Sequence, residues 1–184
     1  MLNISKTYTS LELVGPISWP EIFAVWKAGE AHQPSWQKHW QERGFDSWEE
    51  WRQAYAAPLH PETLSWFLYK IKDPIKDLPL FYGVPTKAWI EKAYDGKQTK
   101  MFSEIINLPI LKDNAKVLDI KQSFPQKTML TGLIYGNDII LVEGMHRAAA
   151  LADWDPQKSL DSEVTIALAE WNNKLPAIGG DYKK

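Results

Sequence analysis

Cysteine is absent from this sequence of 184 residues, and its absence excludes several kinds of chemistry. Without thiols the chain can form no disulfide, no thiolate metal site and no cysteine nucleophile. An excess of positive charge is also missing, because 21 Lys and Arg stand against 23 Asp and Glu, a formal net charge of −2. The chain as a whole lacks the electrostatic footprint of a nucleic-acid-binding protein. We therefore do not expect nucleic acid as its main partner.

Long apolar runs are missing too. No run approaches the roughly 20 residues needed to span a bilayer. Residues 1–14 mix polar and apolar side chains and do not show the charged and then apolar stretches of a secretory signal. With 45% hydrophobic residues, the chain has enough apolar material for one core. We expect one compact, soluble, cytoplasmic domain over residues 1–184 that does not contact a membrane.

Tryptophan is abundant, and it is concentrated in the first third of the chain. Ser18 and Ser47 are typical helix N-caps, and apolar residues follow each of them at helical spacing. The region 18–55 is therefore predicted to form short helices, and Gly44 to end the middle one. The rings have two possible uses, as core or as an aromatic cage for a base, a sugar or an ammonium group. Seven of the ten tryptophans lie within residues 1–66: Trp19, Trp26, Trp36, Trp40, Trp48, Trp51 and Trp66.

Three more helices are predicted before residue 109, over 61–71, 86–94 and 97–106. The first rests on an apolar stripe that ends at Asp73-Pro74, and the second on Pro85 at its start. Residues 1–108 are accordingly expected to form a mainly helical lobe.

After residue 109 the pattern changes to that of β-structure. Residues 116–121 alternate as a strand does, and residues 129–142 read as a hairpin around Gly136-Asn137-Asp138. A short Ala-rich helix over 145–153 and a last strand over 163–171 complete a lobe expected to end at residue 175, followed by a flexible tail over 176–184. The predicted fold class is α+β, a Trp-rich helical lobe packed on a small mixed β-sheet.

The segment Val142–Arg147 carries the residues best suited to chemistry. Gly144 breaks a strand and opens a helix, whose N-terminal N–H groups favour an anion. Arg147 offers a planar guanidinium for phosphate oxygens, and His146 offers a hydrogen-bond donor or a proton carrier. Glu143 is a candidate base or a contact to a metal-bound water. A purely structural alternative stays open, in which Arg147 pairs with a nearby acid and His146 caps or packs.

This segment resembles a motif of the ParB/sulfiredoxin superfamily, in which a hairpin leads into acidic-Gly-x-His-Arg at the start of a helix. The matching stretch runs from Ile139 to Ala150, within a region of resemblance from about Ala115 to Trp171. In sulfiredoxins and the free-serine kinases of the superfamily the motif binds ATP phosphates, and in ParB proteins its counterpart binds CTP. The resemblance implies a ParB/sulfiredoxin-type sheet in which Gly144, His146 and Arg147 bind nucleotide phosphates.

The sequence departs from that family at two points. Met145 stands where sulfiredoxins need a cysteine, which excludes their reaction. ParB proteins usually have Glu-Arg-Arg and a following helix-turn-helix domain, whereas 37 residues follow Arg147 here, so a chromosome-partition role is not expected.

Other candidates are weaker. His32 and His39 lie two helical turns apart with Pro34 between them, so we predict no metal site there, nor in the chain as a whole. His60, before Pro61, reads as a loop residue. Three segments could add to a ligand site or be ordinary turns and solvated lysines: Phe81–Pro85 with Lys87 and Trp89; Lys97, Thr99 and Lys100; and the loop 123–128.

These observations lead to one main hypothesis and two rivals. The main one is an enzyme that uses ATP (or another nucleotide) with Mg²⁺ to transfer phosphate to a small molecule, with Glu143 and His146 as catalytic residues. The first rival is a non-enzymatic module in which a nucleotide or another anion switches binding of a protein partner to the Trp-rich lobe. The second is a ParB-like DNA-binding protein, which the net charge disfavours.

Overall fold

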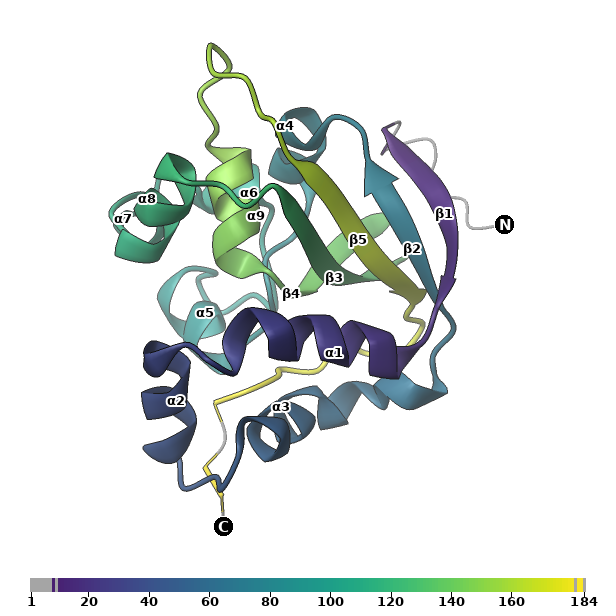
Figure 1. Cartoon of the computed structure of the whole chain (residues 1–184), viewed down its shortest axis with the longest axis vertical. Coiled ribbons are helices and arrows are strands. Elements are labelled where there is room, and N and C mark those ends of the chain that lie inside the picture. The colour runs from purple at the N-terminus through teal and green to yellow at the C-terminus, as the bar shows by residue number, and fades with distance from the viewer. Residues whose placement is uncertain (1–7, 9, 181, 184) are drawn as a thin grey trace.

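The computed structural model of this chain describes residues 8, 10–180, 182 and 183 (Figure 1). Its strands are β1 (Leu11–Ile17), β2 (Trp66–Ile71), β3 (Lys127–Tyr135), β4 (Asp138–Glu143) and β5 (Glu163–Glu170). Its α-helices are α1 (Trp19–Glu30), α2 (Pro34–Gln41), α3 (Trp48–Ala56), α4 (Pro74–Asp77), α5 (Lys87–Lys92), α6 (Phe102–Ile105), α7 (Pro109–Lys112), α8 (Ala115–Gln122) and α9 (Met145–Ala152). Short 3-10 helices in the described part cover Ala57–Leu59, Pro61–Thr63 and Leu78–Leu80.

The five strands form one mixed sheet in the order β1-β2-β5-β3-β4. The pairs β1/β2, β2/β5 and β3/β4 are antiparallel, whereas β5 lies parallel to β3. The predicted α+β class and the predicted hairpin are therefore confirmed. The expected boundary at residue 108 does not divide the sheet, because β1 and β2 precede it and β2 pairs with β5.

The Trp-rich helices begin where their caps predict. Ser18 and Glu21 form a capping box at the start of α1, and the Ser47 side chain accepts a hydrogen bond from Glu50 N at the start of α3. Gly44 adopts a φ of 81° beyond the end of α2. In Figure 1, α1 runs beside one end of the sheet, and α2 and α3 lie beyond it on the side of the C-terminus.

Two predicted elements are wrong in type. The helix predicted over 61–71 is a 3-10 turn followed by strand β2, and the strand predicted over 116–121 is helix α8. The run Trp66–Ile71 is mainly apolar, so its sequence pattern fits a helix as well as a strand. Pairing with β1 and β5 makes it a strand. Asn114 settles the second case, because its side chain accepts hydrogen bonds from Lys116 N and Val117 N and so caps a helix.

One more predicted helix is too long, and the segment predicted as a tail makes contacts with the rest of the chain. The helix predicted over 97–106 is only the four-residue α6, because Met101 is held extended by a bridge to Tyr82. The flexible tail predicted over 176–184 is packed where the structure describes it. Ile178 is fully buried and its N–H donates to Pro85 O, and Lys183 pairs with Asp46 and Glu50. Residues 181 and 184 lie outside the described part.

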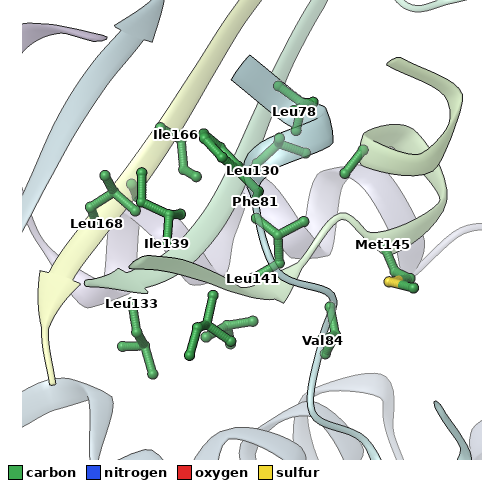
Figure 2. Packing of buried hydrophobic residues seen from close by; sticks show 14 of the residues in the cluster. Leu78, Phe81, Val84, Leu130, Leu133, Ile139, Leu141, Met145, Ile166 and Leu168 are labelled. Atoms are coloured by element: carbon green, nitrogen blue, oxygen red, sulfur yellow. The ribbon is translucent and has the colours of Figure 1, made fainter. Parts of the chain in front are cut away.

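The core joins the sheet to helix α9 and to the segment before α5 (Figure 2). Leu130, Ile139 and Ile166 are fully buried on three neighbouring strands. The segment around Tyr82 also covers the free edge of β4, because Tyr82 N donates to Ile139 O and Leu141 N donates to Tyr82 O. This packing fixes the end of β4, and with it the turn that follows.

No helix in the described part of the chain is long and apolar enough to cross a membrane.

Candidate functional site

The turn from β4 into α9 has the backbone geometry that its sequence predicts. Gly144 is the N-cap of α9 with a φ of 99°, a left-handed conformation that favours glycine. A Cβ at this position would also collide with the side chain of Leu130. Gly144 brings no side-chain cap to the helix, so the first N–H groups of α9 are not capped from that position.

Arg147 is used mainly to hold this turn together. Its Nη2 donates to both carboxylate oxygens of Glu143, at 2.5 and 2.6 Å. Its Nη1 donates to Thr128 Oγ1 at 2.6 Å and to Met129 O at 3.2 Å. The guanidinium therefore ties the start of β3 to the end of β4, as in the structural alternative left open by the sequence.

Glu143 is a buried carboxyl, 8% exposed, at the border of a cleft. Burial raises its pKa, and the neighbouring Arg147 acts in the opposite direction. A carboxyl of this kind gains a proton more readily than an exposed glutamate, which suits a base or a proton carrier.

His146 lies on the first turn of α9 and is uncharged at neutral pH. Burial, together with the positive charges of Lys116 and Arg147, lowers its pKa to about 4. Its ring meets Trp89 of α5 edge-on, with 6.2 Å between the ring centroids. A neutral imidazole at a helix N-terminus can still donate one hydrogen bond to an anion.

A second acid–arginine pair lies among the Trp-rich helices. Arg52 of α3 donates to both oxygens of Glu30 of α1, and Trp48 Nε1 donates to the same carboxylate at 3.1 Å. Arg52 is 5% exposed, and four aromatic rings lie within 5.6 Å of its guanidinium carbon. The rings are those of Trp26, Trp36, Trp51 and Tyr55.

Most tryptophans of this region belong to the core. Trp26, Trp48, Trp51 and Trp66 are each at most 5% exposed, and Trp26 Nε1 donates to Thr131 Oγ1 on β3 at 2.9 Å. The remaining three of the seven are partly buried. Of the two uses expected for these rings, packing therefore accounts for most of them.

A cleft with two adjoining chambers borders the β4–α9 turn. The larger chamber, of about 430 Å³, lies between α1, α8, the start of β3 and the turn. Lys116, Asp119 and Lys127 contribute its charged rim, together with Arg147. Lys116 Nζ lies 3.8 Å from the centroid of the Trp36 ring, so that α8 and α2 meet above the cleft. Burial lowers the pKa of this lysine.

The smaller chamber, of about 220 Å³, has several aromatic rings among its lining residues. Its rings come from α2, α3, α5 and α9, and Gly179 and Gly180 of the C-terminal segment close it. Both chambers share six residues, so they meet across the turn: Glu30, Trp36, Glu143, Gly144, Met145 and His146.

The structure brings together some of the weaker candidates and separates others. Trp89 reaches the cleft, and so do three residues of the predicted loop 123–128: Pro125, which precedes β3, and Lys127 and Thr128, which begin it. Lys97, Thr99 and Lys100 line neither chamber. Thr99 instead donates to Gly83 O, and Lys100 pairs with Asp95. His60 is an exposed loop residue with a positive φ of 45°.

The donor set does not fit a metal ion held by the protein. Among the residues that the structure describes, no three histidine or acidic side chains gather in one place. Glu143 and Glu30, the buried acids of the cleft, each already face an arginine. The Mg²⁺ implied by the family resemblance would therefore need its ligands from a bound nucleotide and water.

Sequence reasoning missed three residues of the cleft. Glu30 and Arg52 lie 22 positions apart, a spacing that carries no local signal. Lys116 was assigned to a strand, so its place beside Trp36 could not be anticipated. The capping residue Asn114 was the one available hint that Lys116 begins a helix.

Comparison of the chain with protein-family models, with curated proteins and with solved structures finds no match in any of the three.

Proposed function

We propose that this protein binds a phosphate-bearing small molecule, of the size of a nucleotide, in the cleft at the β4–α9 turn. The observation that carries the proposal is the position of two lysines. Lys116 and Lys127 line the larger chamber next to the N-terminus of α9, and neither forms an ion pair with the described residues. A partly buried cation without an ion-pair partner, such as Lys116, favours an anionic ligand, and the exposed Lys127 adds a second positive charge beside it.

The phosphate would bind differently from the way expected for this motif. Arg147 has its two Nη groups committed to Glu143, Thr128 and Met129. The available donors are Lys116, Lys127, the imidazole of His146 and the N–H groups that open α9. Asp119 also lines this chamber and is exposed, so its negative charge would repel a phosphate there.

The dimensions of the cleft suit a nucleotide better than a free phosphate. The larger chamber alone holds about 430 Å³, within the roughly 300–1,000 Å³ that small-molecule sites occupy. ATP is the nucleotide to test first, and CTP the second, because the motif resembles those that bind them. No step of the proposal depends on a Mg²⁺ ion held by the protein.

Phosphoryl transfer is a second candidate, and Glu143 is the observation that favours it. The carboxyl lines both chambers and has a pKa raised by burial. It would take the proton of an acceptor hydroxyl while that oxygen bonds to the terminal phosphorus of the nucleotide, the bond from this phosphorus to the bridging oxygen breaks, and the nucleoside diphosphate leaves. Glu143→Gln should then abolish turnover and spare nucleotide affinity. A module that only binds would have no turnover to lose.

A role in docking a protein partner has less support from the Trp-rich helices. Their rings are mostly packed in the core, so few remain for a partner. In this alternative the nucleotide would act as a ligand that changes the helices' surface rather than as a substrate.

The test is the affinity of the protein for ATP, CTP, GTP, ADP and inorganic tripolyphosphate, each with and without Mg²⁺. Titration calorimetry would give the affinity, and the rise of the unfolding midpoint would give an independent measure. In Lys116→Met the side chain keeps its length and loses its charge, so we expect affinity to fall about tenfold.

The matched control is Lys112→Met, which changes an exposed lysine of α7 that lines neither chamber. This variant should bind as tightly as the original protein. Equal losses in the two variants would show a general effect of charge and not a site. Absence of binding by every compound would overturn the proposal.

A further inference from the structure

We propose that the smaller chamber is the subsite for the base of the bound nucleotide, whose phosphates lie in the larger chamber. This inference rests on the proposed function, and it names the part of the ligand that the Trp-rich half of the protein recognises. The two chambers meet at the β4–α9 turn through Glu30, Trp36, Glu143, Gly144, Met145 and His146. One ligand can therefore pass from one chamber into the other.

The walls of the smaller chamber suit a planar ring. Trp36, Trp51, Tyr55 and Trp89 line it, together with two imidazoles. Aromatic walls hold a base by stacking, which tolerates any base because every base has a π-face. A chamber of about 220 Å³ has room for a ring system but not for a whole nucleotide.

The charges around this chamber are largely balanced before any ligand enters. Glu30 is paired with Arg52, and Glu143 with Arg147. His39 and His146 are uncharged at neutral pH. Arg43 is the remaining cation, and its guanidinium lies over the Tyr182 ring and donates to a backbone carbonyl. An uncharged ring with polar edges fits these walls better than a second anion does.

Trp89 is the ring most available for stacking. Arg52 lies over the Trp51, Trp36 and Tyr55 rings, and Lys116 lies over Trp36. Trp89 makes an edge-on contact with His146, and it is not one of the rings over which Arg52 or Lys116 lies. A base entering from the turn would thus meet Trp89 beside His146.

The experiment measures three probes on the full chain: ATP, adenosine and inorganic tripolyphosphate. In Trp89→Leu we expect the affinity for ATP and for adenosine to fall about tenfold or more, because one stacking ring is lost. The affinity for tripolyphosphate should stay unchanged. Trp154→Leu is the matched control, since Trp154 is also partly buried but lines neither chamber.

A second variant fills the smaller chamber and leaves the Trp89 ring in place. Ala88 lies exposed on α5 and lines the smaller chamber, so Ala88→Phe should block the base and again spare tripolyphosphate. If both variants bind ATP as tightly as the original protein does, the base lies elsewhere and this proposal is overturned while the phosphate site stands. If neither ATP nor tripolyphosphate binds the original protein, the proposed function itself fails.

Discussion

The helices α1–α3 and the β4–α9 turn each hold a glutamate–arginine pair, and the two pairs differ in their surroundings. Arg52 is 6% exposed at its side chain and lies among four rings, whereas Arg147 is 26% exposed and borders the larger chamber. Both acids are at most 10% exposed at their side chains. Both pairs line the cleft, but the first has the more buried arginine, whereas the arginine of the second is partly exposed.

The comparison explains where the chain can tolerate change. A buried pair contributes little when set against an apolar replacement of the same shape, but removing one partner leaves an uncompensated charge. The pair at the turn differs, because burial already raises the pKa of Glu143. When Arg147 is removed, this carboxyl can become neutral by taking up a proton. Replacing the arginine by methionine should therefore lower the free energy of unfolding by different amounts at the two sites.

Arg52→Met is expected to have the largest effect. It leaves Glu30 buried with only Trp48 Nε1 as a donor, so the free energy of unfolding should fall by about 3–5 kcal/mol. Urea denaturation followed by far-UV circular dichroism measures the loss. The double variant Glu30→Met/Arg52→Met should recover part of it, because both charges are then gone. A single variant as stable as the original protein would show that the buried Glu30 carboxylate does not depend on Arg52.

Arg147→Met should lower the free energy of unfolding by less, about 1–3 kcal/mol. The variant loses the hydrogen bonds to Thr128 and Met129, but it does not leave a buried charge without a partner. The loss should shrink as the pH is lowered and Glu143 gains its proton. The free energy of unfolding of both arginine variants should be measured at pH 8 and at pH 5. Equal losses for Arg52→Met and Arg147→Met at both pH values would remove the distinction between the two sites.

Local features of the sequence predicted much of this second site. The hairpin, the Gly144 turn and helix α9 are confirmed, because each depends on neighbouring residues: a tight turn, a residue with a positive φ, and a short Ala-rich stretch. Pairing of Arg147 with a nearby acid was one of the two alternatives, and the structure shows that this acid is Glu143, at the end of β4.

The first site could not be predicted, and the reason is distance along the chain. Glu30 and Arg52 lie on different helices, and nothing in their spacing signals a contact. The residues of strand β2 are predicted as part of a helix because the partners β1 and β5, which make them a strand, lie far away in the sequence. The predicted helical lobe and sheet lobe thus share one sheet, and the cleft between the two sites became visible only with the tertiary structure.

The smallest expected effect concerns His146, which lies between the two regions. Its pKa of about 4 in the folded chain is below the ordinary value of 6.5, so the unfolded chain binds the proton more tightly. Stability from this group is therefore complete above pH 6.5 and is lost as the pH falls from 6.5 to 4. His39 acts in the same direction and remains in the variant His146→Gln.

The difference between the original protein and His146→Gln isolates this one imidazole from His39 and from the carboxyls. Between pH 7.5 and pH 4.5 we expect the original protein to lose about 1 kcal/mol more than the variant, less than the full shift would give because the ring borders an open cleft. Urea denaturation at the two pH values measures it. Because the charge of Lys116 helps to lower this pKa, Lys116→Met should also reduce the loss, which would link the imidazole to the lysine proposed to hold phosphate. Identical losses in all three proteins would show that His146 titrates as an ordinary surface histidine and does not face Lys116.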